Sequence, residues 1–249
     1  MFMQNAHIWG KLHLFGKKVV LLFLFLTIGF QAFGQRDRTI NLPNYDKRWL
    51  HYGFYLGIEA FQYRLKYSDL FVTPEMDSVL SINPAVTYGP VNIGFVVNFK
   101  LAEFLNLRLL PKFGINERKI EYTYASGNKE TQIIEAVTMD FPLLLKYKSV
   151  RRGNYRMYFV GGINPSVRVG GKKDVNKEED RLNIKDSDLS IEFGFGLDVY
   201  YPFFKFSPEI RFSRGIVNNL SSETNFYSKG IDRLTTNSVS LFLYFEGGR

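Results

Sequence analysis

The sequence predicts an all-β protein: a membrane-spanning, antiparallel, up-and-down β-barrel of eight strands. Eight segments alternate apolar and polar residues with a period of two, and the connections between them alternate between long and short. In outer-membrane barrels one face of each strand contacts lipid, and loops are long on the outer side and short on the periplasmic side. A third observation is an N-terminal stretch with the features of a secretory signal peptide.

The four N-terminal strands are predicted at residues 51–65, 91–100, 105–118 and 137–147. Their apolar faces are, in order, Tyr52, Phe54, Leu56 and Ile58; Val91, Ile93, Phe95, Val97 and Phe99; Leu105, Leu107, Leu109, Phe113 and Ile115; and Val137, Met139, Phe141, Leu143, Leu145 and Tyr147. Most of the residues between them are polar, charged or glycine. No segment repeats its apolar residues every three or four positions, so a helix is a poor alternative.

The four C-terminal strands are predicted at residues 155–169, 189–199, 204–212 and 238–246. Their apolar faces are Tyr155, Met157, Phe159, Ile163, Val167 and Val169; Leu189, Ile191, Phe193, Phe195, Leu197 and Val199; Phe204, Phe206, Ile210 and Phe212; and Val239, Leu241, Leu243 and Phe245. Aromatic residues make up 16% of the chain, and several lie near predicted strand ends, where they suit the headgroup level of a membrane. These aromatic residues are Tyr52, Phe54, Phe99, Phe104, Tyr147, Tyr155, Tyr200, Tyr201, Phe203 and Phe204.

The connections predict which side of the membrane each end faces. Residues 66–90, 121–130, 170–186 and 215–233 are long connections, and 101–104, 149–154 and 201–203 are short ones. An even number of strands places both termini on the side of the short turns, which is the periplasm, and the long loops outside.

The N-terminus divides the chain into a leader, a short polar segment and one barrel domain. Lys17 and Lys18 precede a twelve-residue apolar run, and small residues follow before Gln35. Twelve residues are too few to cross about 30 Å of hydrocarbon as a helix, so we interpret residues 1–34 as a cleaved signal peptide. Removing this leader removes three lysines and no acidic residue, which lowers the net charge from +8 to +5. Residues 35–50 form a periplasmic segment or a cap on the barrel mouth, and residues 51–249 form the barrel.

The polar faces of the strands carry charges of both signs. An eight-stranded barrel is only wide enough for its own side chains, so a wide porin is excluded. Charges at membrane depth are often functional, which would allow an ion path. Because the two signs are balanced and dispersed over most strands, we favour a packed salt-bridge network that rigidifies the barrel. Its predicted members are Glu59, Arg108, Lys112, Asp140, Lys146, Arg156, Arg168, Glu192, Asp198, Lys205, Glu209 and Arg211.

The sequence offers little for catalysis or for cofactors. His51 is the only histidine after the leader, and it lies at the periplasmic start of the first strand, away from the outer rim. A nucleophile and its base must come within hydrogen-bond reach, so we expect no enzyme and give His51 a structural role. The chain has no cysteine, and its glycine pairs precede no helix that could bind phosphate. We therefore expect no metal site, no cofactor and no nucleic-acid partner.

Several segments resemble PorT-type proteins of Bacteroidetes. The resemblance lies in Asn41-Leu42-Pro43-Asn44-Tyr45-Asp46-Lys47-Arg48, in His51-Tyr52-Gly53-Phe54-Tyr55-Leu56-Gly57, in Asn92-Ile93-Gly94-Phe95 and in Leu105-Asn106-Leu107-Arg108-Leu109-Leu110-Pro111. A further segment, residues 140–147, is similar to a strand of many Bacteroidetes outer-membrane barrels. One departure is that the chain continues past Phe245 to Arg249, so the usual terminal aromatic residue comes four residues early.

The resemblance implies a place in the type IX secretion system, which exports cargo with a C-terminal sorting domain and, in gliding species, motility adhesins. It implies an outer-membrane component needed for export, with other secretion-system proteins as partners and outer-membrane lipid around it. The alternative is a generic small barrel with a structural or surface-ligand-binding role.

We also predict a docking role for the segment before the first strand. Tyr, Trp and Arg dominate the energetics of interfaces, and this segment holds Tyr45, Asp46, Arg48 and Trp49 as candidate partner-binding residues. The alternative for the same segment is that it tethers the barrel or caps its lumen.

Overall fold

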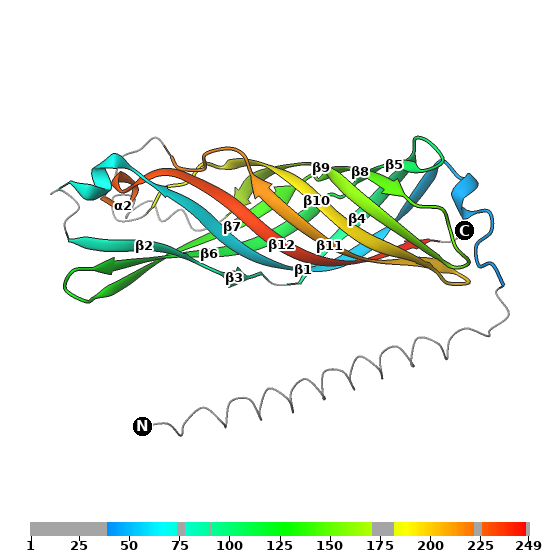
Figure 1. The fold of residues 1–249 in the computed structure, drawn as a ribbon, viewed down its shortest axis with the longest axis horizontal. Helices are drawn as coiled ribbons and strands as arrows, with labels where there is room; N and C mark the ends of the chain where they lie inside the picture. Colours follow the sequence, from blue (N-terminus) through cyan, green and yellow to red (C-terminus); the bar gives the residue numbers. More distant parts are fainter. Residues whose placement is uncertain (1–38, 74–77, 90, 171–181, 222–225, 248–249) are drawn as a thin grey trace, which may run out of the picture. The chain divides into compact units, whose positions relative to one another are not determined.

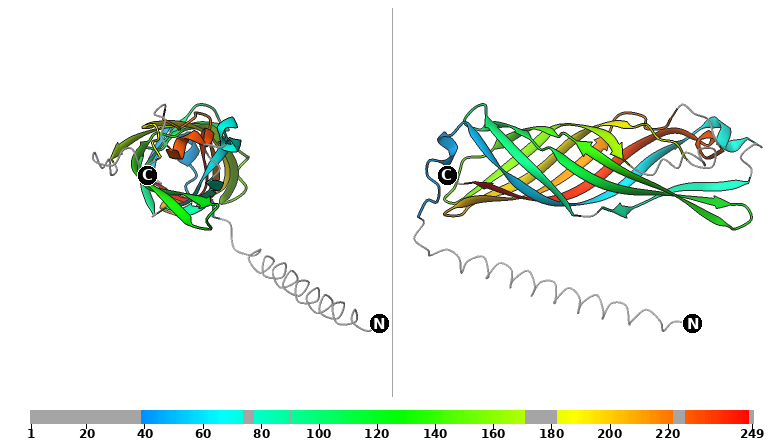
Figure 2. Two further views of the ribbon diagram at one scale, coloured as in Figure 1. Left: turned by 90° about the vertical axis from the view of Figure 1, so that its left-hand side faces the viewer. Right: turned by 180° about the vertical axis from the view of Figure 1, so that it is seen from behind.

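A computed structural model describes residues 39–73, 78–89, 91–170, 182–221 and 226–247. The predicted leader lies outside the described residues. Twelve strand segments form one antiparallel sheet that closes on itself, and Figure 2 shows the resulting ring in end view. They are β1 Leu50–Tyr67, β2 Val79–Ala85, β3 Thr87–Tyr88, β4 Asn92–Lys100, β5 Leu105–Leu109, β6 Lys112–Tyr124, β7 Lys129–Asp140, β8 Leu143–Lys148, β9 Tyr155–Gly170, β10 Ser187–Tyr200, β11 Phe204–Gly215 and β12 Ile231–Gly247.

These twelve segments make eight barrel strands, as predicted. β2, β3 and β4 follow one another along one barrel strand, and the pairs β5–β6 and β7–β8 do the same (Figure 1). The ring closes because β1 pairs with β12 on one side and with β4 on the other. The breaks after β5 and β7 fall at Pro111 and Pro142, because proline has no N–H for the strand ladder.

The predicted alternation between lipid-facing and inward residues is confirmed. On β10, for example, Phe193 is 57% exposed while the adjacent Glu192 is 4% exposed. One aromatic residue was assigned to the wrong face: Tyr200 is 2% exposed and lies inside the barrel, where it makes an edge contact with Tyr45. It occupies an inward position of β10, two residues after Asp198, so the alternation itself gives the correct face.

The three predicted short turns gather at one end of the barrel, here called the turn end, and the other connections gather at the loop end (Figure 1). Two predicted loops were wrong. Residues 66–90 contain β2 and β3, and the connection from β6 to β7 is a tight turn over residues 125–128, with Gly127 at φ +84°. β12 also begins at Ile231, seven residues before the predicted start of the last strand. Outside the bilayer an outward residue faces water, so these extensions lack the apolar face that marks a membrane strand.

Three short helical turns complete the described chain. They are η1 Tyr45–Lys47 at the turn end, and η2 Asp69–Val72 and α2 Phe226–Lys229 at the loop end. Within the described residues, none of the helices has the length and hydropathy needed to cross a membrane.

Two apolar clusters lie inside the barrel. The first is in the middle of the lumen and consists of Tyr55, Val96, Leu110, Leu144, Tyr158, Val160, Phe242 and Tyr244. The second is at the loop end and consists of Tyr63, Val79, Ile82, Ile120, Tyr122, Leu182, Ile231 and Leu234. The polar residues that matter for function lie on both sides of the first cluster and between the two.

Candidate functional site

Arg108, at the centre of the lumen, joins acidic side chains from two other strands. Its Nη1 lies 2.9 Å from Oε2 of Glu209 on β11, and its Nη2 lies 3.2 Å from Oε1 of Glu246 on β12. All three side chains are fully buried. The guanidinium also lies 4.6 Å from the ring centroid of Tyr244, which adds a cation–π contact. Arg108 therefore crosslinks strands that lie on different sides of the barrel.

Toward the loop end, two more cations continue this set of contacts. Lys112 Nζ lies 2.7 Å from Oε1 of Glu59 and 3.4 Å from Oδ2 of Asp140. Arg211 Nη1 lies 3.0 Å from Oε2 of Glu192, and the same guanidinium also bonds Glu209. The shared Glu209 links the Arg211–Glu192 pair to Arg108, while Lys112, Glu59 and Asp140 form a neighbouring cluster of their own among the described residues.

Toward the turn end, Asp198 and Glu246 each bind a lysine. Lys146 Nζ lies 2.7 Å from Oδ1 of Asp198, and Lys205 Nζ lies 3.0 Å from Oε2 of Glu246. Ser207 adds a hydrogen bond by donating to Asp198 over 2.6 Å. Together with the pairs above, these residues form what we call the charge network. Its members are Glu59, Arg108, Lys112, Asp140, Lys146, Glu192, Asp198, Lys205, Glu209, Arg211 and Glu246.

Two residues predicted for this network lie outside it. Arg156 is near the turn end and contacts Asp46 of the N-terminal segment at 2.8 Å. Arg168 is near the loop end and faces Asp186 at 3.8 Å. Conversely, sequence reasoning left out Glu246, which bonds two cations and Tyr45. The period of two from Ser240 through Phe242 and Tyr244 places Glu246 on the inward face, so the signal was present in the sequence.

Glycines let the aromatic cluster fill the space beside the charge network. A Cβ at Gly196 would lie 2.4 Å from the Tyr158 ring, and one at Gly94 would lie 2.4 Å from Tyr55. The neighbour of Gly196 is Tyr158, whose ring centroid lies 3.5 Å from the ammonium group of Lys146. Rings and ion pairs thus fill the middle of the barrel.

The N-terminal segment, residues 40–49, closes the turn end. Tyr45 is 4% exposed; its ring stacks on His51 at 4.0 Å, and its hydroxyl donates to Glu246 over 2.9 Å. Burial and the Glu246 carboxylate raise the pKa of Tyr45 well above its usual value, so the phenol remains a donor. His51 Nε2 lies 2.8 Å from the Tyr45 carbonyl oxygen, which gives this histidine a structural contact.

This burial corrects part of the predicted docking set. Tyr45 lies inside the barrel and Asp46 faces Arg156, so neither is an exposed anchor for a partner. Arg48 is exposed, and Trp49 is 68% exposed with its ring 6.2 Å from Phe99. Tyr45 therefore caps the lumen, and Arg48 and Trp49 present a basic and an aromatic side chain at the rim.

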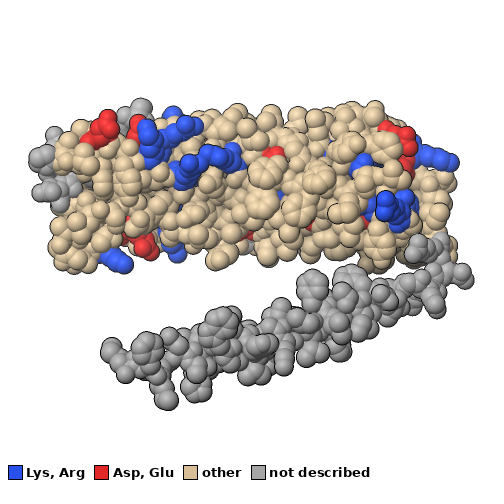
Figure 3. All heavy atoms as spheres, in the orientation of Figure 1, with Lys and Arg blue, Asp and Glu red and all other residues tan. Residues whose placement is uncertain are grey.

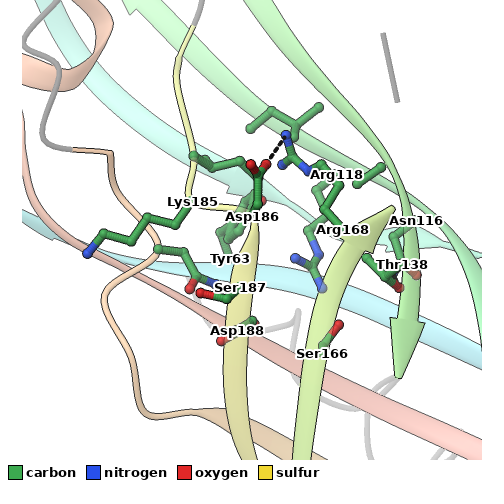
Figure 4. Close-up of a pocket in the computed structure, with 14 residues that line it drawn as sticks. Tyr63, Asn116, Arg118, Thr138, Ser166, Arg168, Lys185, Asp186, Ser187 and Asp188 are labelled. Atoms are coloured by element: carbon green, nitrogen blue, oxygen red, sulfur yellow. Dashed lines mark hydrogen bonds and ion pairs between the residues drawn. The ribbon is translucent and has the colours of Figure 1, made fainter. Parts of the chain in front are cut away.

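A polar chamber lies between the charge network and the loop-end cluster. Two pockets adjoin there because Asn116, Arg118, Ser166 and Asp188 line both of them. Figure 4 shows the Arg118, Arg168 and Asp188 side chains around one of these pockets. We call this space the loop-end chamber.

The chamber holds most of the buried polar atoms that have no hydrogen-bond partner among the described residues. Seven of the twelve such atoms belong to residues that line it: Tyr63, Asn116, Arg118, Asn164, Asp188, Asn219 and Asn237. An unsatisfied buried polar atom costs about 1–3 kcal/mol, and proteins usually satisfy such atoms with water. We therefore expect the loop-end chamber to be hydrated and the middle of the lumen to be filled by side chains. In the described part of the chain, no three His, Asp or Glu side chains come together as a metal site.

The chain is similar to one known protein family and to several solved structures. Residues 33–221 match the family described as "Outer membrane protein beta-barrel domain". Similar solved structures include OprG from Pseudomonas aeruginosa, at 12% identity and TM-score 0.43, covering 80% of this chain and 91% of that one. Others are Ail of Yersinia pestis (9% identity, TM-score 0.38, 80% and 99% covered) and Neisserial surface protein A (9%, 0.38, 77% and 96%). No curated protein matches the chain significantly.

Proposed function

This chain belongs to the outer membrane protein beta-barrel domain family, and we propose that it serves type IX protein secretion as a docking or assembly element and not as a pore or an enzyme. The observation that supports a closed barrel, and not a pore, is the full burial of Arg108 between Glu209 and Glu246. Ion pairs and rings at this level occupy the width of a small barrel, whose interior only just accommodates its own side chains. Cargo proteins therefore have to pass elsewhere.

The resemblance to PorT-type proteins supports the proposed role in type IX secretion. That resemblance includes the N-terminal segment and the start of β1, which lie at the capped turn end, as well as parts of β4 and β5. Export of cargo with a C-terminal sorting domain, and of motility adhesins in gliding species, requires components that meet at the periplasmic face of the outer membrane. Because the turn end faces the periplasm, its rim is the surface that secretion partners can reach.

Arg48 and Trp49 are the residues we assign to that contact. Both are exposed, while Tyr45 three residues earlier is held inside the barrel by Glu246. A partner that binds this rim thus meets a pair of anchors on a fixed segment, and a fixed segment loses little conformational entropy on binding. Trp and Arg are also the residue types most enriched among interface hot spots.

The test uses a clean deletion strain complemented with full-length variants. We expect the deletion to remove C-terminal-domain cargo from the medium and accumulate it in the periplasm. The double variant Arg48→Ala/Trp49→Ala should insert normally yet fail to restore export, since a hot-spot tryptophan alone contributes about 2 kcal/mol, or about thirtyfold in affinity. Phe203→Ala is the matched control, because Phe203 is a 78% exposed aromatic residue in another turn of the same end.

Two outcomes would contradict the proposal at different points. Normal export in the deletion strain removes the secretion role. A defective deletion strain that is fully restored by the double variant removes the rim contact and leaves the pathway intact. Deleting the whole N-terminal segment is a weaker test, because losing Tyr45 would also open the lumen.

The loop-end chamber favours one other function, that of a generic barrel with a structural or surface-ligand role. Its unpartnered polar atoms are placed to hold small polar solutes or water near the cell exterior. A deletion strain that exports normally but becomes sensitive to detergent or bile salts would support this alternative.

A further inference from the structure

The outward face of β11, β12 and β1 changes from apolar to basic toward the loop end. Ile58, Val239 and Ile210 face lipid and are 54%, 49% and 38% exposed. Beyond them the outward positions of the same three strands hold four exposed basic residues, which we call the basic collar: Arg64, Lys66, Arg214 and Arg233. Figure 3 shows basic side chains gathered on this face toward the loop end, beside a band with few charges.

The strand register brings the members of the collar together. Lys66 is directly opposite Arg233, Arg64 is opposite Thr235, and Arg214 is opposite Asn237. Adjacent strands are about 5 Å apart and outward residues on one strand are about 7 Å apart, so the four basic groups share one small patch. Like charges at such spacing repel unless an anion lies between them.

Among the described residues, only one of the four cations has an acidic partner. Lys66 lies 2.7 Å from Asp232, and Arg233 donates to the Ile216 carbonyl oxygen over 2.8 Å. In the described part of the chain, the side chains of Arg64 and Arg214 make neither a hydrogen bond nor an ion pair, although both residues pair in the strand ladder. Both are exposed, so their donors are free for a ligand outside the barrel.

The opposite side of the barrel has a different charge. There the outward residues Glu117 and Glu135 are opposite one another on β6 and β7, and Lys119 lies 2.8 Å from Glu117. One wall thus carries two opposed acidic residues, one of them paired with a lysine, while the wall formed by β11, β12 and β1 carries four basic residues, of which Lys66 alone pairs with an acid among the described residues. A surface that merely needed solubility would not require this asymmetry.

We propose that the basic collar binds the phosphate groups of the phosphorylated glycolipid in the outer leaflet. The collar directly follows the lipid-facing band, so it lies at the headgroup level. Guanidinium groups bind phosphate through two parallel hydrogen bonds, and basic residues near an anionic membrane surface each contribute severalfold to affinity. The contact fixes which wall of the barrel faces the glycolipid, and it is independent of the secretion role.

The test measures binding of lipid A to the full mature protein in zwitterionic detergent, by native mass spectrometry. Bisphosphorylated lipid A should bind and the dephosphorylated form should not. Arg64→Gln/Arg214→Gln should weaken binding about thirtyfold, or about fivefold per arginine. Arg64→Lys/Arg214→Lys should retain part of the affinity, and raising the salt concentration should weaken binding to the wild type.

Lys119→Gln/Lys129→Gln is the matched control, because it removes two positive charges from the loop end on the acidic side of the barrel. It should bind lipid A as the wild type does. Equal affinity for the phosphorylated and dephosphorylated lipids would overturn the proposal. Equal losses of lipid A affinity in Arg64→Gln/Arg214→Gln and Lys119→Gln/Lys129→Gln would overturn it too. Competition by free inorganic phosphate at the concentration of the lipid would also overturn it, because the collar would then bind the ion without the membrane.

Discussion

The middle of the lumen and the loop-end chamber are both lined by polar side chains, but these side chains are satisfied differently. In the middle, Arg108 contacts two carboxylates and is fully buried. In the chamber, Arg118 contacts no carboxylate among the described residues and makes only ring contacts, 5.4 Å from the Phe61 centroid and 5.1 Å from the Tyr63 centroid. The protein thus has a region held by charge pairs and a region that we expect water to satisfy.

The difference shows which luminal charges hold the barrel together. A buried ion pair is not strongly stabilising as a whole, because both charges were desolvated to make it. Removing one partner is costly nonetheless, since it leaves the other charge buried and unpaired. A charge beside a hydrated chamber keeps water as a partner, so its removal costs little. The same substitution should therefore have different effects in the two regions.

The largest effect is expected for Arg108→Met. Methionine fills much of the space but leaves Glu209 and Glu246 with one cation fewer each, and breaking a buried pair typically costs about 3–5 kcal/mol. Arg118→Met removes two cation–π contacts and should cost about 1 kcal/mol. The free energy of unfolding in urea, with the protein refolded into lipid vesicles, measures both. Equal losses would show that the chamber and the middle of the lumen are held in the same way.

Adding a methyl group should lower the free energy of unfolding by different amounts in the two regions, and this difference should be smaller than that for the arginines. Gly196→Ala in the middle of the lumen places a Cβ 2.4 Å from Tyr158 and 2.7 Å from the Pro208 carbonyl oxygen, and such overpacking costs about 1–3 kcal/mol. Gly114→Ala beside the chamber meets Thr138 Oγ1 at 3.3 Å and should cost less than about 1 kcal/mol, because that side chain can shift. The urea unfolding free energies of the two variants make the comparison. If Gly114→Ala were the more damaging, the chamber would be the more tightly packed region.

The sequence predicts the fold well where the chain is in the membrane. A lipid-facing residue must be apolar and an inward one need not be, so a period of two assigns Arg108, Asp198 and Glu209 to the lumen correctly. The same reasoning fails for residues 66–90 and for the turn at residues 125–128. There the strands have left the bilayer, and both faces can be polar.

The partners inside the lumen could not be read from the sequence. Arg108 and Glu246 are 138 positions apart, and their contact depends on strand tilt and on the stagger of eight strands around the ring. The destination of Tyr45 could not be predicted either, because an aromatic residue in a polar segment fits a surface anchor as well as a buried cap. The burial of Tyr45 follows from the position of Glu246 at the turn end of the lumen, where its carboxylate accepts the Tyr45 hydroxyl.

Cysteine placed in the two regions should change the stability of the barrel little, but the thiols should differ greatly in reactivity. The chain has no cysteine of its own, so single variants can be labelled without background. Ser166 lines both pockets of the chamber, and Ser207 is 0% exposed and bonds Asp198. Ser166→Cys should react readily with a charged methanethiosulfonate reagent. Ser207→Cys should react at least about a hundredfold more slowly, because the reagent has to wait for local opening of the barrel.

Each result of this labelling has a consequence for the comparison. An inert Ser166→Cys in a folded barrel would mean that the chamber is dry. The unpartnered polar atoms of the chamber would then lower the stability of the barrel without compensation from water. Rapid labelling of Ser207→Cys would be more serious, because water would then pass through the charge network. The lumen would act as an ion path after all, and the proposal of a closed docking element would fail. Slow labelling at Ser207 that becomes fast in urea, with fast labelling at Ser166 throughout, is the result that the two regions predict.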